Sequence, residues 1–170
     1  MRLFGLAGWS GSGKTTLMTA LIPEFVSRGI TVSTIKHAHH SFDIDTPGKD
    51  SWLHRQAGAR EVMVASGQRW ALMHELRGAA EPSLDQMLER MAAVDLVIVE
   101  GFKHHDHPKI EVYRPALGKP MLHPDDPFVV AVASDQPLAE FSRPWLPLSD
   151  SGAIAEFILG HQAGLDRWHS

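Results

Sequence analysis

Apolar runs and helical patterns alternate along most of the chain. Short apolar runs bounded by turn residues predict strands, and they recur at 3–7, 31–35, 62–65, 70–76, 96–99, 110–113 and 128–133. Apolar positions spaced three or four residues apart predict helices over 15–28, 84–91 and 154–158. Strands that alternate with helices favour an α/β fold with a mainly parallel sheet and helices on both faces.

Two segments depart from this alternation. The run from Glu61 to Leu76 has Ser66-Gly67-Gln68 at its centre, which is typical of an antiparallel hairpin, so we expect a mixed sheet. Pro23 falls inside the first predicted helix, where a proline removes a hydrogen bond at a cost of about 3 kcal/mol and should kink or interrupt the helix. Eight of the eleven prolines lie between Pro108 and Pro147, which predicts loops and short strands there.

Composition narrows the class of protein. A chain of 170 residues that is 44% hydrophobic can bury one core, which predicts a single domain over residues 1–170. Its formal charge of −4 gives no general attraction to nucleic acid or to an anionic membrane, so any phosphate must be bound by a local site. The lack of cysteine excludes disulfides, and no charged leader or apolar run of about 18 residues is present. We therefore expect a cytoplasmic protein.

The segment from Gly8 to Thr16 reads G-W-S-G-S-G-K-T-T and lies between a predicted strand and a predicted helix. It fits the phosphate-loop pattern, in which glycines bring bare backbone N–H groups against phosphate oxygens. The helix that follows adds its own unpaired N–H groups and the positive end of its dipole. The residues that we expect to bind a nucleotide are Gly11, Ser12, Gly13, Lys14, Thr15 and Thr16.

Two residues of this loop have further chemical tasks. Lys14 would reach the β and γ phosphates as a mobile positive charge, which makes it a catalytic candidate as well, and the Thr15 hydroxyl would bind Mg²⁺. A carboxylate should complete the metal site, and the strand at 96–99 has an acid on each side, Asp95 and Glu100. Ligands of parallel sheets lie beyond the C-terminal strand ends. We therefore expect Glu100 to bind the metal and Asp95 to be a solvated strand start.

Histidines crowd two loops that follow predicted strands, at 35–45 and 102–107. Both loops leave C-terminal strand ends, which places six of the eleven histidines on the rim of the nucleotide site. Three interpretations stay open: a transition-metal site, a surface that binds anions or a partner, and plain exposed loops. The anion or partner surface, here called the rim, would comprise His37, His39, His40, Lys49 and Lys103.

Aspartates are candidates for the reaction and for the base. Asp43 or Asp45 could order a water on Mg²⁺ or orient the attacking water, as an acid after the second strand would, and of the two we favour Asp45. The chain has no asparagine, so the N-K-x-D motif for guanine is incomplete. Asp135 follows the run from Val129 to Ser134 and could instead accept both N1–H and N2–H of guanine, or be an ordinary turn aspartate.

Three stretches resemble the MobB family of molybdopterin-guanine dinucleotide biosynthesis proteins. They are the phosphate loop, the segment I-K-H-A-H-H-S-F-D-I-D-T-P-G-K-D-S running into H-R-Q-A-G-A, and D-L-V-I-V-E-G-F-K. The resemblance implies a homodimer of three-layer P-loop NTPase fold that binds GTP with Mg²⁺ and hydrolyses GTP weakly. It also implies an adapter role beside the guanylyltransferase that attaches GMP to molybdopterin, with a mobile loop at 47–50 near the γ phosphate. Whether molybdopterin itself docks on the rim stays open.

Two other functions remain for such a scaffold. A small-molecule kinase commonly closes an arginine-bearing lid over the transferred group. The predicted loop at 37–49 has no arginine, although Arg55 or Arg60 on the next element could swing in. A partner-binding module, in contrast, could use the nucleotide only to order its loops.

Overall fold

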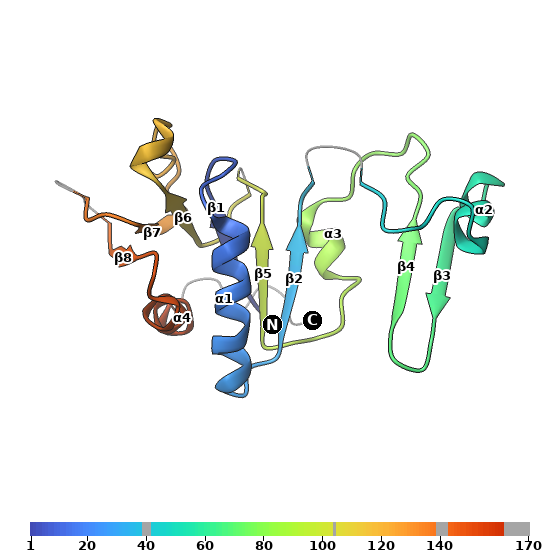
Figure 1. Cartoon of the computed structure of the whole chain (residues 1–170), viewed down its shortest axis with the longest axis horizontal. Coiled ribbons are helices and arrows are strands. Elements are labelled where there is room, and N and C mark those ends of the chain that lie inside the picture. The colour runs from blue at the N-terminus through green and yellow to red at the C-terminus, as the bar shows by residue number, and fades with distance from the viewer. Residues whose placement is uncertain (39–41, 104, 139–142, 162–170) are drawn as a thin grey trace. The chain divides into compact units, whose positions relative to one another are not determined.

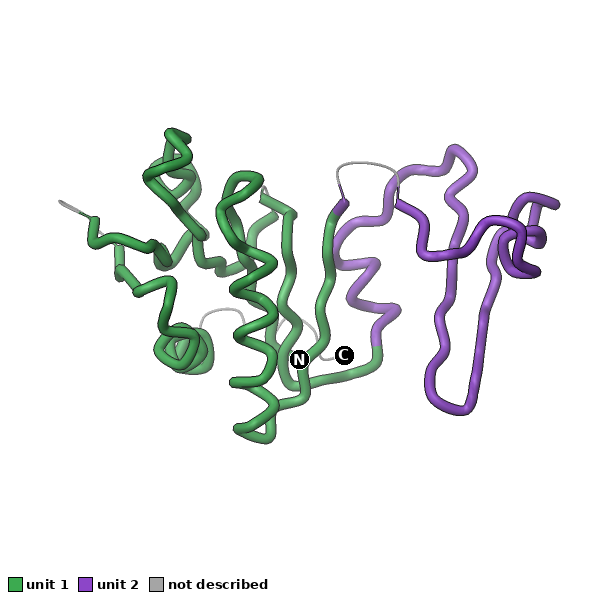
Figure 2. Tube along the Cα trace, viewed as in Figure 1, with its two compact units in different colours: residues 1–37, 92–170 green, residues 38–91 purple. Residues whose placement is uncertain are grey.

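The chain divides into two compact units, and the computed structural model describes residues 1–38, 42–103, 105–138 and 143–161. The first unit comprises residues 1–37 and 92–170, and the second comprises residues 38–91 (Figure 2). The elements, labelled as in Figure 1, are β1 (Arg2–Ala7), α1 (Lys14–Ser27), β2 (Val32–Lys36), α2 (Asp50–Gln56), β3 (Glu61–Ala65), β4 (Trp70–His74), α3 (Leu84–Leu88), β5 (Leu96–Glu100), β6 (Lys109–Tyr113), the 3-10 turn η1 (Pro115–Leu117), β7 (Val129–Ser134), β8 (Trp145–Pro147) and α4 (Ser151–Gly160). The organisation of the chain as a single domain stays a prediction.

A six-stranded parallel sheet forms the centre of the first unit. Its strand order is β2-β5-β1-β6-β7-β8, and each neighbouring pair of strands runs parallel. β1 and β5 are almost wholly buried, as is usual for apolar strands inside a parallel sheet. This arrangement confirms the predicted α/β class with its mainly parallel sheet. Because all six carboxyl ends lie at one edge, the loops that follow these strands start from a common edge of the sheet.

The core of the first unit lies between the sheet and the helices α1 and α4, which pack against each other. Leu17, Leu21 and Phe25 recur four residues apart on α1 and are buried. Ile154 and Ile158 are buried in the same way on α4. Each such side chain contributes about 1.5–3 kcal/mol when fully buried, so this layer holds α1, and the loop before it, against the sheet.

The helix α1 runs without interruption through Pro23, so the predicted interruption is wrong, and a kink at this residue stays a prediction. The hydrogen bond that Pro23 cannot donate would go to the carbonyl of Thr19. Both residues lie on the exposed side of the helix, where water can serve instead. Within the part of the chain that the structure describes, no helix combines the length and the apolar character that crossing a bilayer requires.

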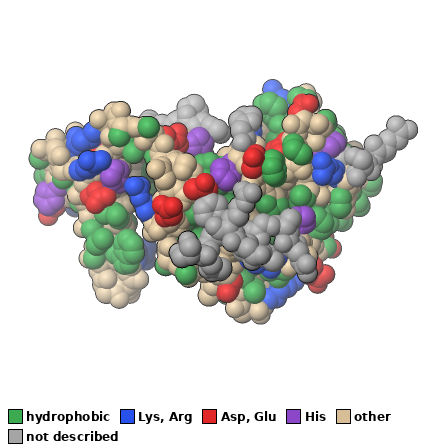
Figure 3. All heavy atoms as spheres, turned by 180° about the vertical axis from the view of Figure 1, so that it is seen from behind, with side chains coloured by type: hydrophobic (Ala, Val, Ile, Leu, Met, Phe, Trp, Pro, Cys, Tyr) green, Lys and Arg blue, Asp and Glu red, His purple; other side chains and the backbone are tan. Residues whose placement is uncertain are grey.

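The second unit contains the predicted hairpin. β3 and β4 pair antiparallel and form a two-stranded sheet of their own, so the antiparallel pair that led us to expect a mixed sheet is separate from the parallel one. Large apolar side chains are exposed on this hairpin, and Figure 3 shows a group of apolar side chains at the lower left. The large apolar side chains exposed on the hairpin are Met63, Val64, Trp70 and Leu72. Exposed apolar side chains that gather in this way mark a candidate surface for association.

Candidate nucleotide-binding site

The phosphate loop, residues 8–13, connects β1 to α1 at the carboxyl edge of the parallel sheet. Gly8, Gly11 and Gly13 have positive φ angles of 144°, 80° and 101°, which L side chains rarely adopt. A β carbon at Gly8 would also lie 2.5 Å from the carbonyl oxygen of Val112. The backbone path of the loop therefore requires glycine at these positions.

The side chain of Lys14 reaches back across the loop. Its ammonium donates to the carbonyl oxygens of Gly8 at 3.0 Å and Trp9 at 2.9 Å. Burial lowers the pKa of this ammonium, Glu100 opposes that shift, and two neighbouring lysines reinforce it. Positive charge therefore accumulates beside the loop, and a bound anion would be stabilised by all three lysines.

Thr15 and Glu100 bring a hydroxyl and a carboxylate together next to the loop. The Thr15 Oγ1 lies 3.3 Å from Oε1 and 3.4 Å from Oε2 of Glu100. Hydroxyl and carboxylate oxygens suit Mg²⁺, so this pair fits a metal ion held jointly with nucleotide phosphates. Lys36 Nζ lies 3.9 Å from the same carboxylate and balances its charge. Asp95 precedes β5 at the opposite end, where it accepts hydrogen bonds from the N–H and the hydroxyl of Thr31 at 2.8 Å and 2.6 Å.

Trp9, the second residue of the loop, is held by two other loops. Its indole N–H donates to the carbonyl of Pro120 at 2.7 Å. The ammonium of Lys103 lies 4.5 Å from its ring centroid, and that of Lys119 lies 5.9 Å away. Lys103, which we predicted for the rim, is thus placed directly beside the phosphate loop. Sequence reasoning gave Trp9 and Lys119 no role, because these contacts join residues about a hundred positions apart.

Arg114 contacts the phosphate loop from the end of β6. Its Nε donates to the carbonyl of Ser12 at 3.0 Å, and its Nη1 donates to Oδ2 of Asp135 at 3.3 Å. Asp135 directly follows β7 and so lies at the same edge of the sheet as the loop. Its role in reading guanine stays a prediction. Arg114 was missed from the sequence, where only its position just after the strand ending at Tyr113 could have pointed to it.

Among the rim histidines, His37 extends the strand pairing of β2 and β5. Its N–H donates to the carbonyl of Glu100 at 2.9 Å, and its ring centroid lies 5.0 Å from that of Phe102. A β carbon at Gly101 would lie 2.7 Å from Cβ of His37, so the two loops touch. Within the described residues, no group of three or more His, Cys, Asp or Glu side chains could hold a metal ion. The predicted histidines outside the described residues are His39, His40 and His104.

His107 is buried, so the expectation that all six histidines of these two loops lie at the edge of the nucleotide site is wrong for this residue. Its side chain packs so closely on β1 that a β carbon at Gly5 would overlap its Nε2. Its Nδ1 lies 3.1 Å from Nδ1 of His105. Burial, reinforced by the positive charge of Lys109, lowers the pKa of His107 to about 3. This histidine is therefore a neutral core residue.

Lys109 at the start of β6 is a fully buried lysine, with only 1% of its side chain exposed. Its ammonium donates to the carbonyls of Lys103 and His105 and to Oδ2 of Asp126, each at 2.9 Å. These bonds connect the loop after β5 to the sheet. The same loop contains Lys103, which lies beside the phosphate loop. In the sequence, Lys109 stands just before the apolar run 110–113. This position alone does not predict that its ammonium is buried.

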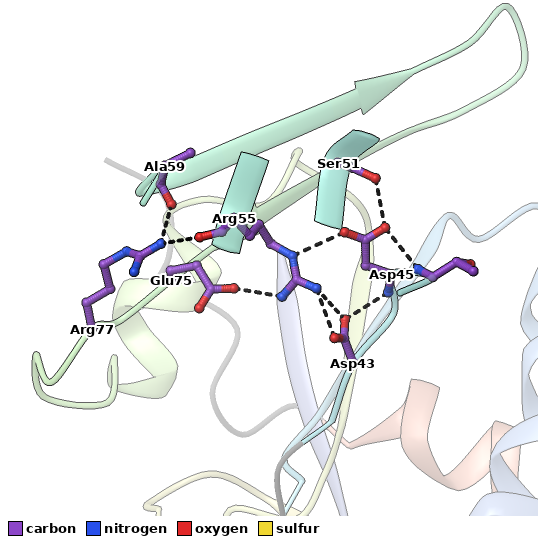
Figure 4. A network of polar contacts seen from close by, with 8 residues as sticks. Asp43, Asp45, Ser51, Arg55, Ala59, Glu75 and Arg77 are labelled. Atoms are coloured by element: carbon purple, nitrogen blue, oxygen red, sulfur yellow. Dashed lines mark hydrogen bonds and ion pairs between the residues drawn. The ribbon is translucent and has the colours of Figure 1, made fainter. Parts of the chain in front are cut away.

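In the second unit, Arg55 of α2 is bound by three carboxylates (Figure 4). Its guanidinium contacts Glu75 at 2.8 Å, Asp43 at 2.9 Å and Asp45 at 3.1 Å, and these bonds raise its pKa. Asp45 also accepts from the Ser51 hydroxyl at 2.8 Å and from a backbone N–H at 3.0 Å. Both oxygens of Asp45 are thus engaged inside this unit, which gives it a structural role. Its catalytic role stays a prediction.

Lys49, also predicted for the rim, is exposed at the beginning of α2. Its N–H donates to the carbonyl of Thr46 at 3.1 Å, and its own carbonyl accepts from the N–H of Leu53 at 2.9 Å. The segment 47–50 therefore leads directly into a helix. Its mobility, and its place near a γ phosphate, stay predictions.

Comparisons with known proteins agree on one group. A family model described as MobB, molybdopterin guanine dinucleotide synthesis protein B, matches residues 3–135. The molybdopterin-guanine dinucleotide biosynthesis adapter protein of Escherichia coli is 45% identical over 160 residues, which cover 92% of this chain and 91% of the relative. The Haemophilus influenzae protein of the same name is 44% identical over 158 residues, which cover 92% of this chain and 86% of the relative.

Solved structures are similar over nearly the whole chain. The crystal structure of a molybdopterin-guanine biosynthesis protein B matches with a TM-score of 0.73 at 30% identity, covering 92% of this chain and 97% of the other. The crystal structure of Bacillus subtilis MobB matches with a TM-score of 0.72 at 20% identity, covering 94% and 96%. The second match shows the likeness of the fold alone.

Proposed function

Because the chain belongs to the MobB family, we propose that it is a GTP-binding adapter in the formation of molybdopterin guanine dinucleotide, the nucleotide form of the molybdenum cofactor. The observation that carries this proposal is the glycine loop with Lys14 folded across it, next to Thr15 and Glu100. The adapter names of the two bacterial relatives support the biosynthetic role, and the residues of the loop support the nucleotide.

The loop would hold the phosphate tail through backbone N–H groups and one mobile cation. Residues 11–16 supply N–H groups at the N-terminus of α1, where the helix dipole adds positive potential. Lys14 would exchange its bonds to two loop carbonyls for oxygens of the β and γ phosphates. Thr15 and Glu100 would hold Mg²⁺, which neutralises phosphate charge when it is bound.

We assign at most slow GTP hydrolysis to this site. Efficient hydrolysis requires a residue that orients the attacking water. Our candidate, Asp45, has its two carboxylate oxygens bound by Ser51 at 2.8 Å and by Arg55 at 3.1 Å, and only 7% of its side chain is exposed. Slow hydrolysis suits an adapter, because the bound nucleotide then lasts long enough to order the loops that meet a partner.

A small-molecule kinase is the alternative function with less support. Its lid would require an arginine free to reach the transferred phosphoryl group. Arg55 is not free, because Glu75, Asp43 and Asp45 hold it. Moving it would leave three neighbouring carboxylates to repel one another.

The proposal includes contacts with a second copy and with the guanylyltransferase. Two hairpins that expose Met63, Trp70 and Leu72 could cover each other's apolar side chains, which would make the protein a homodimer. Lys103 and Lys119 lie beside the phosphate loop and are our candidates for contact with the phosphate of molybdopterin. The partner guanylyltransferase would then meet the same edge of the sheet.

Isothermal titration with GTP, ATP and molybdopterin, each with and without Mg²⁺, tests the nucleotide site. We expect GTP to bind more tightly than ATP, and more tightly with Mg²⁺ than without it. Lys14→Ala should abolish nucleotide binding while the thermal unfolding curve stays unchanged. Arg28→Ala, at the exposed end of α1, is the control and should bind like the wild type. Unchanged GTP affinity in Lys14→Ala would refute the site.

A coupled assay with a molybdopterin guanylyltransferase tests the adapter role. We expect the wild-type chain, but not Lys14→Ala, to raise the rate at which the dinucleotide forms. If the wild-type chain gives no increase, the adapter role is wrong. Rapid phosphoryl transfer to a small acceptor would favour the kinase instead.

A further inference from the structure

We propose that Arg114 positions Asp135 for guanine and links it to the phosphate loop, so that the preference for GTP over ATP depends on both residues. This inference rests on the proposed GTP binding and extends it to a residue on another strand. Arg114 would be a positioning residue, because it acts on the base through Asp135.

Strand register makes Arg114 and Asp135 neighbours. Tyr113 of β6 pairs with Ser134 of β7 at the carboxyl ends of these adjacent parallel strands. Arg114 and Asp135 each come directly after this pair, so both leave the same edge of the sheet. β6 also lies next to β1, which runs into the phosphate loop. The strand order and register therefore place the phosphate loop, Arg114 and Asp135 after three successive strands at the same edge of the sheet.

The guanidinium of Arg114 binds the loop and the aspartate at once. Its Nε donates to the Ser12 carbonyl at 3.0 Å, and its Nη1 donates to Oδ2 of Asp135 at 3.3 Å. A β carbon at Gly13 would lie 3.4 Å from Nη2 and 3.5 Å from Nε, so the planar group rests against the loop. Because the donors of a guanidinium point in fixed directions, a shift of the Ser12 carbonyl would also shift the carboxylate of Asp135.

Asp135 keeps the capacity to bind a base while it is held by Arg114. A carboxylate has about four lone-pair sites, and this bond uses one side of Oδ2. The remaining sites can accept the N1–H and N2–H of guanine, a donor pair that adenine lacks. The two side chains are 40% and 34% exposed, so the ion pair by itself adds little stability. Its importance would lie in the orientation of the carboxylate.

The contacts of Arg114 also allow another role, in which it only stabilises the conformation of the phosphate loop; we call this role a brace. A brace acts on the bound phosphates, which GTP and ATP share, so its loss would weaken both nucleotides equally. A positioning residue acts on the base, so its loss would weaken GTP and leave ATP unchanged. The ratio of the two dissociation constants therefore separates the roles.

Titration calorimetry of the full chain with GTP and ATP measures this ratio. The variants are Arg114→Gln, Asp135→Asn and their double variant. We expect each single change to reduce the preference for GTP about tenfold or more, because each removes a charge-assisted hydrogen bond near the base. The double variant should lose little beyond either single variant, since both changes remove one shared interaction.

Two further variants make the result decisive. Arg28→Gln is the matched control, because Arg28 is paired with Glu24 at 2.7 Å just beyond the last residue of α1, and it should leave the preference unchanged. Arg114→Lys keeps the charge and loses the planar fork, so it should also lose the preference. If circular dichroism shows that Arg114→Gln is unfolded, Arg114→Lys decides the question.

The possible results separate this inference from the proposed function. Equal weakening of GTP and ATP by Arg114→Gln would make Arg114 a brace and overturn the inference. A wild-type chain that binds both nucleotides equally, or a GTP preference that survives in Asp135→Asn, would overturn it as well while the phosphate site stands. A wild-type chain that binds neither nucleotide would refute the proposed function and the inference together.

Discussion

The hydroxyl of Thr15 lies 3.3 Å from the carboxylate of Glu100, which joins the first turn of α1 to the end of β5. The two residues are 85 positions apart in the chain. They meet because β1 and β5 are parallel neighbours, with Leu6 opposite Glu100. The strand order of the sheet, rather than any local pattern, thus builds the proposed metal site.

Glu100→Gln should make GTP binding much less dependent on Mg²⁺. Glutamine keeps the size of the side chain and removes the charge that a divalent ion requires, so we expect the gain in GTP affinity on adding Mg²⁺ to shrink about tenfold or more. Titration of GTP at rising Mg²⁺ concentrations measures the effect. Asp95→Asn changes the acid at the other end of β5 and should leave the Mg²⁺ dependence unaltered. The same dependence in Glu100→Gln as in the wild type would remove Glu100 from the metal site.

Lys109→Met should destabilise the chain strongly. The change leaves the carboxylate of Asp126 and two carbonyls without their buried donor, for which we expect a loss of about 3–5 kcal/mol in the free energy of unfolding. Urea unfolding followed by circular dichroism measures this loss. Lys119→Met, at an exposed lysine, should change stability by less than about 0.5 kcal/mol. Equal stabilities of the two variants would show that the ammonium of Lys109 is not structurally required.

His107 should make the fold less stable in acid. Its pKa is about 3 in the folded chain and about 6.5 when unfolded, so between these values the unfolded chain binds more protons. Stability should therefore fall as pH drops below about 6.5, by up to about 1.4 kcal/mol per pH unit, and this residue should have no effect above that range. Urea unfolding at several values from about pH 7.5 to about pH 4.5 measures the slope.

Two variants isolate the contribution of His107. His107→Asn keeps a hydrogen-bonding group near the position of Nδ1 and cannot be protonated in this range, so the slope should become flatter. His54→Asn replaces an exposed histidine of α2 and should leave the slope as it was. An unchanged slope in His107→Asn would assign the acid sensitivity to other groups.

The hairpin should control self-association. Met63 pairs with Leu72, and Trp70 lies on the same face of the two-stranded sheet. Met63→Ser with Trp70→Ser should weaken the dimer about a hundredfold or more, because buried aromatic and apolar anchors dominate such contacts. Analytical ultracentrifugation across a range of concentrations measures the change. Val26→Ser, at an exposed apolar side chain of α1, is the control, and a wild-type chain that stays monomeric throughout would rule out the hairpin dimer.

The parts of the fold that could be predicted from the sequence are those that depend on local patterns of residues. The apolar run of β1, the four-residue spacing of Leu17, Leu21 and Phe25, and the hairpin each depend on residues close in sequence. The short helix α2 was not foreseen, because its seven residues carry no apolar stripe. It is supported instead by the ion pairs of Arg55 with carboxylates as many as twenty positions away.

The candidate site divides in the same way. The glycine and lysine positions of the phosphate loop form a local motif, so they could be named from the sequence. The contacts of Arg114 and of Trp9 depend on which strands are neighbours and on their register. His107 was misplaced because a histidine-rich loop suggests exposure, whereas the lack of a side chain at Gly5 leaves room for this one ring.

The buried bond between Lys109 and Asp126 also constrains how such a chain can change over generations. The ammonium of Lys109 is buried and is costly without a counter-ion, which Asp126 supplies from a side chain that is 20% exposed. A descendant that lost Asp126 would keep a buried charge without its partner, whereas one that replaced both residues with apolar ones would not. Substitutions at positions 109 and 126 should therefore occur together among homologues. An alignment in which the two positions vary independently would mean that neither charge depends on the other.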